Sequence, residues 1–206
     1  TIFEGDALTV LQRLPDCSVQ SVITSPPYWG LRDYSISDQL GLEGTLPQYV
    51  NALRSVFSEV RRVLKNDGIF WLHIGDGYTS GKRGWRAHDK KNPARGMAVR
   101  PDTPDGRKPK DLIGVPWRLA FALQEDGWYL RADIVWNKPN AMPESVKDRP
   151  TRSHEYVFMF TKDERYFYDR AAIMEMNGAG KRNRRSVWNV HTQGFPGAHF
   201  ATFPLA

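Results

Sequence analysis

The strongest constraint on the fold is a continuous stretch, residues 47–74, in which a helical pattern leads directly into a strand pattern. Apolar residues recur every three or four positions from Pro47 to Lys65, which predicts a helix with one apolar face. Proline suits the first turn of a helix, and Asn66-Asp67-Gly68 predicts its end. The apolar run Gly68–Ile74 then predicts a buried strand. This order is typical of an α/β sheet.

Other segments extend the same alternation. We expect a short helix over Ala7–Leu14, a buried strand over Val19–Thr24 and a second long helix over Pro116–Glu125. Strands are expected over Trp128–Trp136 and Glu155–Thr161. No helix separates these last two strands, so an antiparallel pairing between them is possible. The sequence as a whole predicts the α/β fold class.

Composition narrows the function classes. The single cysteine, Cys17, rules out an internal disulfide and a four-cysteine zinc cluster, and it suits a reducing cytoplasm. We expect no membrane partner and no secretory signal, because no apolar run approaches the roughly 18 residues of a membrane span. The five histidines show no metal-ligand spacing, so no metal site is predicted. The net charge of +6 favours a polyanion, nucleic acid first.

Two long segments are predicted to be basic surface insertions. The first, at about 79–110, has many lysines and arginines and no hydrophobic period, and the second, at about 177–198, contains Lys181-Arg182-Asn183-Arg184-Arg185. Loops of this length inside a domain are usually functional or disordered. We expect them to contact DNA, with a merely solvated loop as the alternative. The candidate contacts are Lys82, Arg83, Lys90, Lys91, Arg182, Arg184 and Arg185.

The segment Thr24–Trp29 has the composition of a reactive site. It follows a predicted strand, and ligands of open α/β sheets bind outside the carboxyl ends of strands. Its two prolines remove two backbone donors, so we expect their carbonyls to be acceptors without partners in the chain. The Ser25 hydroxyl can also accept, and Tyr28 and Trp29 add flat faces. This corner suits the exocyclic amino group of a flat base.

The chemistry of that amino group explains the need for acceptors. Its nitrogen is a poor nucleophile in cytosine and adenine, because the lone pair is delocalised into the ring. Acceptors on both N–H bonds, here Ser25 Oγ and the Pro26 carbonyl, favour a more tetrahedral nitrogen that can attack a methyl group. Stacking on Tyr28 is worth about 1–3 kcal/mol per base, and a base in duplex DNA must first be flipped out. The predicted catalytic residues are Ser25, Pro26, Pro27 and Tyr28.

The motif Ser25-Pro26-Pro27-Tyr28 resembles the catalytic signature of the amino-group DNA methyltransferases. The order of motifs resembles their β class, in which the catalytic motif precedes the cofactor motif. The resemblance implies a Rossmann-like methyltransferase sheet and a single, partial catalytic domain over residues 1–206. The other segments that resemble the family are Phe3–Leu8, Leu64–Gly68, Phe70–Asp76, Trp136–Asn140, Pro143–Ser145, Arg149–Glu155, Arg185–Trp188 and His199–Pro204.

The resemblance also implies a function. It implies S-adenosylmethionine-dependent methylation of a base amino group in double-stranded DNA, by a bacterial or phage protein. The Ser form of the motif indicates cytosine N4, whereas the Asp form is associated mostly with adenine N6, which stays as the alternative. Asp6 and Ala7 are implied at the adenine end of the cofactor and Ser25 at its reactive end, although Asp6 also suits a helix N-cap. The residues implied near the target base are Trp29, Lys138 and Asn140.

One departure from the family concerns the cofactor loop. In the β class the last of these motifs leads to a helix, a strand and a Phe-x-Gly-x-Gly loop, whereas this sequence ends at Ala206. We therefore expect a further C-terminal segment or a second chain to complete the cofactor site. Gly75-Asp76-Gly77 lacks a third glycine, and Gly178-Ala179-Gly180 follows no predicted strand. An inactive DNA-binding module stays as a second hypothesis, and methylation of RNA or of a protein amide as a third.

Overall fold

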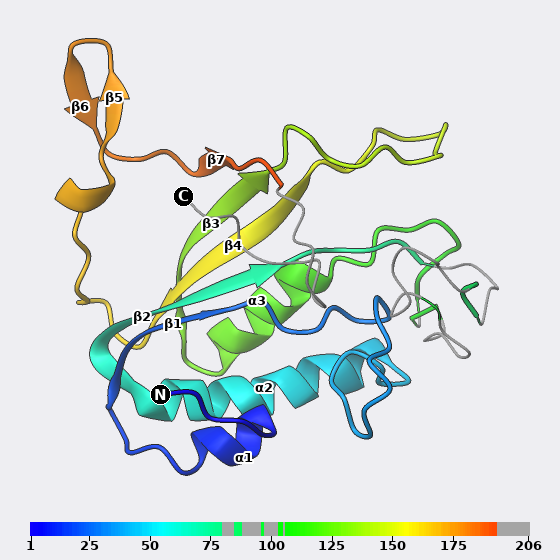
Figure 1. The fold of residues 1–206 in the computed structure, drawn as a ribbon, viewed down its shortest axis with the longest axis horizontal. Coiled ribbons are helices and arrows are strands. Elements are labelled where there is room, and N and C mark those ends of the chain that lie inside the picture. The colour runs from blue at the N-terminus through cyan, green and yellow to red at the C-terminus, as the bar shows by residue number, and fades with distance from the viewer. Residues whose placement is uncertain (80–84, 88–95, 97–102, 105, 193–206) are drawn as a thin grey trace.

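The computed structural model describes residues 1–79, 85–87, 96, 103–104 and 106–192. Helices and strands alternate as far as β3, after which strands follow one another (Figure 1). The helices are α1 (Ala7–Leu11), α2 (Leu46–Val63), α3 (Val115–Glu125) and a 3-10 helix at Ala171–Ile173. The strands are β1 (Val19–Thr24), β2 (Leu64–Ile74), β3 (Tyr129–Asn137), β4 (His154–Thr161), β5 (Glu175–Asn177), β6 (Gly180–Arg182) and β7 (Val187–Asn189).

The central sheet has five strands in the order β1-β2-β4-β3-β7. β1 is parallel to β2 and β7 is parallel to β3, while β4 is antiparallel to both of its neighbours. The possible antiparallel pairing of the last two long strands is therefore confirmed, and so is the α/β class. Because only β4 is reversed among these five strands, the residues that follow β1, β2 and β3 meet the residues that begin β4 at one edge. We call this edge the carboxyl edge.

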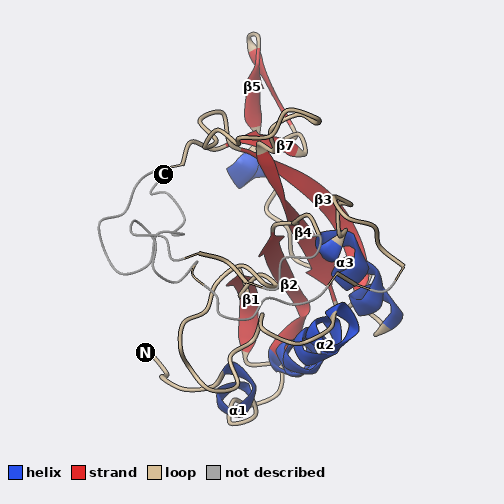
Figure 2. Ribbon diagram, turned by 90° about the vertical axis from the view of Figure 1, so that its right-hand side faces the viewer, coloured by secondary structure: helices blue, strands red, loops and turns tan. Residues whose placement is uncertain are grey.

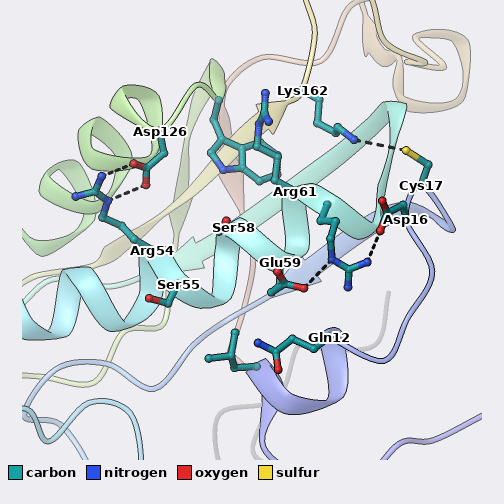
Figure 3. Close-up of a pocket in the computed structure, with 13 residues that line it drawn as sticks. Gln12, Asp16, Cys17, Arg54, Ser55, Ser58, Glu59, Arg61, Asp126 and Lys162 are labelled. Atoms are coloured by element: carbon teal, nitrogen blue, oxygen red, sulfur yellow. Dashed lines mark hydrogen bonds and ion pairs between the residues drawn. The ribbon is translucent and has the colours of Figure 1, made fainter.

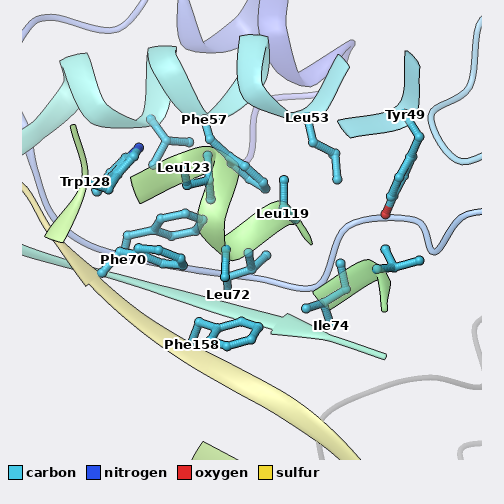
Figure 4. Close-up of a cluster of buried hydrophobic side chains, with 14 of the residues drawn as sticks. Tyr49, Leu53, Phe57, Phe70, Leu72, Ile74, Leu119, Leu123, Trp128 and Phe158 are labelled. Atoms are coloured by element: carbon cyan, nitrogen blue, oxygen red, sulfur yellow. The ribbon is translucent and has the colours of Figure 1, made fainter. Parts of the chain in front are cut away.

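The core lies between one face of the sheet and the helices α2 and α3 (Figures 2 and 4). Side chains alternate along β2, so Phe70, Leu72 and Ile74 face the helices while Trp71 and His73 point to the opposite face. A capping box formed by Thr45 and Gln48 begins α2, and the apolar side of the helix packs against the sheet. The α2 residues buried in this way are Leu46, Tyr49, Leu53, Phe57, Val60 and Val63.

Phe70 is expected to contribute most to stability among the core aromatic residues. Its ring is fully buried and lies 4.9 Å from that of Phe57, 5.3 Å from that of Trp128 and 5.7 Å from that of Phe160, between ring centroids. Phe70→Ala should therefore lower the free energy of unfolding by about 3–5 kcal/mol, measured by urea denaturation. Phe167→Ala, at a side chain that is 62% exposed, is the control and should change it by less than about 0.5 kcal/mol.

Several predicted boundaries and one prediction of burial need correction. The helix expected over Ala7–Leu14 ends at Leu11, and the strand expected from Gly68 begins at Leu64. The helix predicted to reach Lys65 ends at Val63, because the chain enters an extended conformation at Leu64 and pairs with β1 from there. The strand Val19–Thr24 forms as predicted but is not buried, and Ile23 is 67% exposed. β1 pairs only with β2 among the described residues, so it is an edge strand of this part of the sheet. An apolar run alone does not distinguish an edge strand from a central one.

The structure describes the two predicted basic segments to different extents. Most of segment 79–110 lies outside the described residues, including Lys82, Arg83, Lys90 and Lys91. Segment 177–198 is described as far as residue 192 and is not wholly an insertion, because β7 joins the central sheet beside β3. Its residues 177–182 belong to the β5–β6 hairpin, which projects from the body in Figure 1. In the described part of the chain, no helix is long and apolar enough to cross a membrane.

Candidate active site

The Ser25–Tyr28 loop leaves the sheet at the carboxyl edge, directly after β1. Its two proline carbonyls have different surroundings. The hydroxyl of Tyr49, a fully buried residue of α2, donates a hydrogen bond of 2.8 Å to the Pro27 carbonyl. The expectation of two unpartnered carbonyls is therefore wrong for Pro27. The Pro26 carbonyl has no hydrogen-bond donor among the described residues, which leaves one backbone acceptor next to the Ser25 hydroxyl.

Tyr28 is tied to three other strands through one carboxylate. Its hydroxyl donates to Glu155 Oε2 at 3.1 Å, and His73 Nε2 lies 2.8 Å from the same oxygen. Lys138 Nζ lies 2.5 Å from Glu155 Oε1, and Ser25 Oγ lies 3.4 Å from the Tyr28 hydroxyl oxygen. We call these five residues the Glu155 network. They come from the ends of β1, β2 and β3 and from the start of β4, as the sheet topology requires.

Burial and charge set the protonation of this network. Burial alone would raise the pKa of the Glu155 carboxyl, but the hydrogen bond from His73 and the charge of Lys138 lower its pKa to about 2. Glu155 is therefore an ionised hydrogen-bond acceptor at neutral pH. Burial and the charge of Glu155 raise the pKa of Tyr28, so the Tyr28 hydroxyl keeps its proton and donates it to the carboxylate.

Gly75 leaves room for the Tyr28 ring at the end of β2. A Cβ atom at position 75 would lie 2.7 Å from Tyr28 Cε2 and 3.3 Å from the Glu155 carboxyl carbon. Real Cβ atoms essentially never approach a neighbour as closely as the first of these distances. The glycine is therefore explained by the close packing of the ring against the backbone.

A small cavity of about 120 Å³ opens beside the Tyr28 ring, and Trp29, Gly75 and Asp76 are among the residues that line it. The Asp76 side chain is 3% exposed, and Oδ1 accepts the backbone N–H groups of Gly114 and Val115 at 3.0 Å each. It thus caps α3, whose own N-cap residue, Gly114, has no side chain to do so. In the Gly75-Asp76-Gly77 segment, Gly75 therefore serves the packing of the Tyr28 ring and Asp76 caps α3.

A larger hollow of about 890 Å³ lies at the opposite edge of the sheet (Figure 3). Most of its charged side chains form ion pairs with one another: Arg54 with Asp126, and Arg62 with Asp16 and Glu59. No residue of the Glu155 network lines this hollow. Ligands of α/β sheets bind at the carboxyl ends of strands, so we place the candidate site at the Tyr28 cavity despite its smaller volume.

Comparisons with known proteins identify the family of this chain. A family model described as DNA methylase matches residues 19–206. The chain belongs to this DNA methylase family. The Type II methyltransferase M.XycI of Xanthomonas campestris pv. cyanopsidis is 72% identical over 205 residues, which cover 99% of this chain and 68% of that protein.

Two solved structures share the fold of this DNA methylase family member. The PvuII DNA methyltransferase, described as cytosine-N4-specific, matches with a TM-score of 0.61 and 19% identity over 94% of this chain and 58% of its own. A DNA modification methylase from Thermus thermophilus, complexed with S-adenosyl-L-methionine, matches with a TM-score of 0.58 and 20% identity over 92% of this chain and 66% of its own. At these identities the likeness concerns the fold alone, and it confirms the Rossmann-like sheet.

The predicted cofactor residues lie at the start of α1. Asp6 Oδ1 accepts hydrogen bonds from the Thr9 backbone N–H and the Thr9 hydroxyl, each at 2.8 Å, so Asp6 is the N-cap that the sequence also allowed. The hydrogen bonds from Thr9, together with one from the Ala7 backbone, lower the pKa of the Asp6 carboxyl, and the residue is exposed. Ala7 is the first residue of the helix. Contact of Asp6 and Ala7 with a cofactor stays a prediction.

The three residues predicted near the target base make contacts within the protein. Trp29 Nε1 donates to the Glu43 carbonyl at 2.9 Å, and the Trp29 ring packs against the core beside Tyr28. Lys138 belongs to the Glu155 network. Asn140 exchanges two hydrogen bonds with the backbone of Thr192, at 2.8 and 2.9 Å. Trp29 and Lys138 are therefore brought to the site, whereas Asn140 holds the loop after β3 against residue 192.

The predicted DNA contacts that the structure describes lie on the β5–β6 hairpin and just after it. Arg182 and Arg185 both pair with Glu175 Oε1, at 2.8 and 2.9 Å. The Arg184 guanidinium lies 4.8 Å from the centre of the Trp188 ring, a cation–π distance. One carboxylate thus offsets only part of the positive charge that this hairpin carries.

Sequence reasoning missed three residues of the site. Glu155 ends the segment Arg149–Glu155, which resembles the family, but no role is predicted for it, and the structure places it at the centre of the network. His73 lies in the family-like segment Phe70–Asp76 without a predicted role, although a histidine that interrupts an apolar strand on the face opposite the core is a usable signal. The Tyr49 hydroxyl has no signal in the sequence, because the helical period identifies only its apolar ring.

Proposed function

We propose that this protein methylates the exocyclic amino group of a base in double-stranded DNA, most specifically N4 of cytosine, with S-adenosylmethionine as methyl donor. The observation that carries the proposal is the pair of acceptors, Ser25 Oγ and the Pro26 carbonyl, at the carboxyl edge of a DNA methylase fold. The Ser form of the motif and the printed description of the PvuII enzyme favour cytosine N4.

The arrangement of the loop suits this reaction. The hydrogen bond from Tyr49 to the Pro27 carbonyl supports the turn that carries the Ser25 hydroxyl and the Pro26 carbonyl. Two acceptors that bind the two N–H bonds of the amino group draw its lone pair out of conjugation. The Tyr28 ring supplies a surface for the base, and its own position is fixed by Glu155 and by the close approach of Gly75. The chain therefore contributes orientation and acceptors.

The described residues fit part of S-adenosylmethionine. The Asp6 carboxylate is exposed at the start of α1, where it can accept a hydrogen bond from a hydroxyl or amino group of the adenosine end. Ser25 would lie toward the methyl end, and the cofactor would supply the electrophilic methyl group. The two glycine-containing segments do not add to this, because Gly75–Gly77 caps α3 and Gly178–Gly180 forms the turn of the β5–β6 hairpin.

The methylated base identifies the reaction. We expect mass spectrometry of nucleosides from DNA treated with this protein and S-adenosylmethionine to show N4-methylcytosine. Ser25 supplies a neutral acceptor in the position where the Asp form of the motif supplies a charged one. Methylation of adenine N6 alone would overturn the base assignment and keep the reaction class, whereas binding of DNA without any methylated product would support the inactive module instead.

Contact of the hairpin with DNA predicts a salt dependence. Lys181 and Arg184 are exposed cations of the hairpin segment, and if both neutralise phosphates, the double variant Lys181→Ala/Arg184→Ala should reduce the log–log slope of affinity against salt by about 1.8. Fluorescence anisotropy with a duplex over a series of salt concentrations measures this slope. Arg13→Ala/Lys65→Ala removes the same charge from exposed positions in other parts of the fold and should leave it unchanged. Equal slopes for the unmodified protein and both double variants would show that the hairpin is exposed to solvent and does not contact DNA phosphates.

A further inference from the structure

The donors and acceptors of the Glu155 network allow only one direction for its hydrogen bonds. An ionised carboxylate can only accept, so Tyr28 donates to Glu155 across their 3.1 Å contact. The Tyr28 oxygen then has no proton left to give, and Ser25 must donate in the 3.4 Å contact between the two hydroxyls. The Ser25 proton is therefore directed toward Tyr28, and its lone pairs remain for another donor.

We propose that Glu155 is a positioning residue that makes Ser25 an acceptor for the target amino group, by fixing the direction of the Ser25–Tyr28–Glu155 chain. The inference rests on the proposed function, because it takes the amino group of a base as the donor to Ser25. A serine hydroxyl by itself donates or accepts with equal ease. Donation toward the amino nitrogen would occupy the lone pair that the reaction needs.

The surroundings of Glu155 suit this role. Its side chain is 19% exposed, and a carboxylate at that depth is costly unless it is paired. His73 and Lys138, which come from two different strands, compensate its charge at Oε2 and Oε1. The Oε2 atom of Glu155 also accepts the hydrogen bond from the Tyr28 hydroxyl. Hydrogen bonds in a chain polarise one another, so the charge of Glu155 also strengthens Ser25 as an acceptor.

The variant Glu155→Gln tests the direction of the chain in the protein encoded by the whole gene. The amide keeps the size of the side chain but can donate to Tyr28 and reverse the chain. We expect kcat for methyl transfer to fall about 100-fold, as for loss of one preorganised hydrogen-bond group, with KM for DNA nearly unchanged. Glu155→Asp keeps the carboxylate and should recover part of the activity.

Glu59→Gln is the matched control. The Glu59 side chain is 22% exposed and pairs with Arg62 at the opposite edge of the sheet, so its amide variant should keep the kcat of the unmodified protein. Thermal unfolding of both variants shows whether either one is damaged as a whole. A Glu155→Gln protein with the kcat of the unmodified protein would overturn the inference.

A double-variant cycle separates positioning from general damage. Tyr28→Phe keeps the ring but cuts the chain, so adding Glu155→Gln to it should lower kcat by less than about twofold. A further loss as large as in the unmodified background would also overturn the inference, because Glu155 would then act independently of the Tyr28 hydroxyl. Failure of the proposed function is a different result, since the unmodified protein itself would then transfer no methyl group to DNA.

Discussion

Replacement of Tyr28 by alanine is expected to lower the rate of methyl transfer by about 100-fold, since base stacking is worth about 1–3 kcal/mol and a hydrogen bond about 1 kcal/mol more. The substitution removes both the ring beside the cavity and the hydroxyl that links Ser25 to Glu155. Steady-state kinetics on a duplex that contains the recognition site, normalised to folded protein, measures the effect.

Tyr129→Ala serves as the control for the loss of a tyrosine. Tyr129 begins β3 at the edge opposite the site and is 45% exposed, so its removal should leave the rate unchanged. Near-normal turnover by Tyr28→Ala would contradict the assignment of the catalytic corner. Tyr28→Phe should lie between the two, because it keeps the ring and loses only the hydroxyl.

Introduction of a single methyl group at Gly75 should impair the site almost as strongly. The new Cβ of Gly75→Ala would meet the Tyr28 ring at 2.7 Å, so the ring or the end of β2 must move. Overpacking of this kind costs about 1–3 kcal/mol of stability, and a displaced ring breaks the contact with Glu155. We expect at least about a tenfold loss of kcat, because a misplacement of about 1 Å in a catalytic group costs up to about 100-fold.

Gly77→Ala is a matched control for this prediction. Its nearest neighbour would be Ile113 Cδ1 at 3.9 Å, which is ordinary van der Waals contact. Its stability and kcat should therefore remain close to those of the unmodified protein. The double variant Gly75→Ala/Tyr28→Ala adds a further test, because removal of the ring should relieve the clash. If Gly75→Ala retains full activity and full stability, the ring does not require the glycine.

Much of the fold could be predicted from periodicity, but the depth of each element could not. The three- and four-residue spacing of α2 and the apolar run of β2 reflect local burial directly, and both elements form, although the boundary between them lies at Leu64 and not near Gly68. The strand at Val19–Thr24 shows the limit of this reasoning. Its apolar residues indicate a strand, whereas its place at an edge depends on pairing partners that no local pattern encodes.

The candidate site could be located from one motif, while its supporting contacts could not. Ser25 and Tyr28 form a recognisable pattern because they are neighbours in sequence. Glu155 lies 127 positions from Tyr28 and becomes its partner only through the order of strands in the sheet. Although Glu155 ends the family-like segment Arg149–Glu155, its spacing from Tyr28 does not indicate their contact, so its role depends on the three-dimensional structure.

The position of Glu155 at the start of β4 makes two neighbouring parts of the chain differ in their tolerance of insertions and deletions. Side chains alternate between the two faces of a strand. Deletion of one residue of β4 beyond Glu155 would therefore shift the start of the strand by one position, so that Glu155 points away from the site and its neighbour points toward it. The exposed connection at residues 141–148 lies outside the sheet, and a residue added there leaves the pairing of β3 and β4 intact. Insertions and deletions during evolution should therefore gather in that connection, while the length of β4 stays constant.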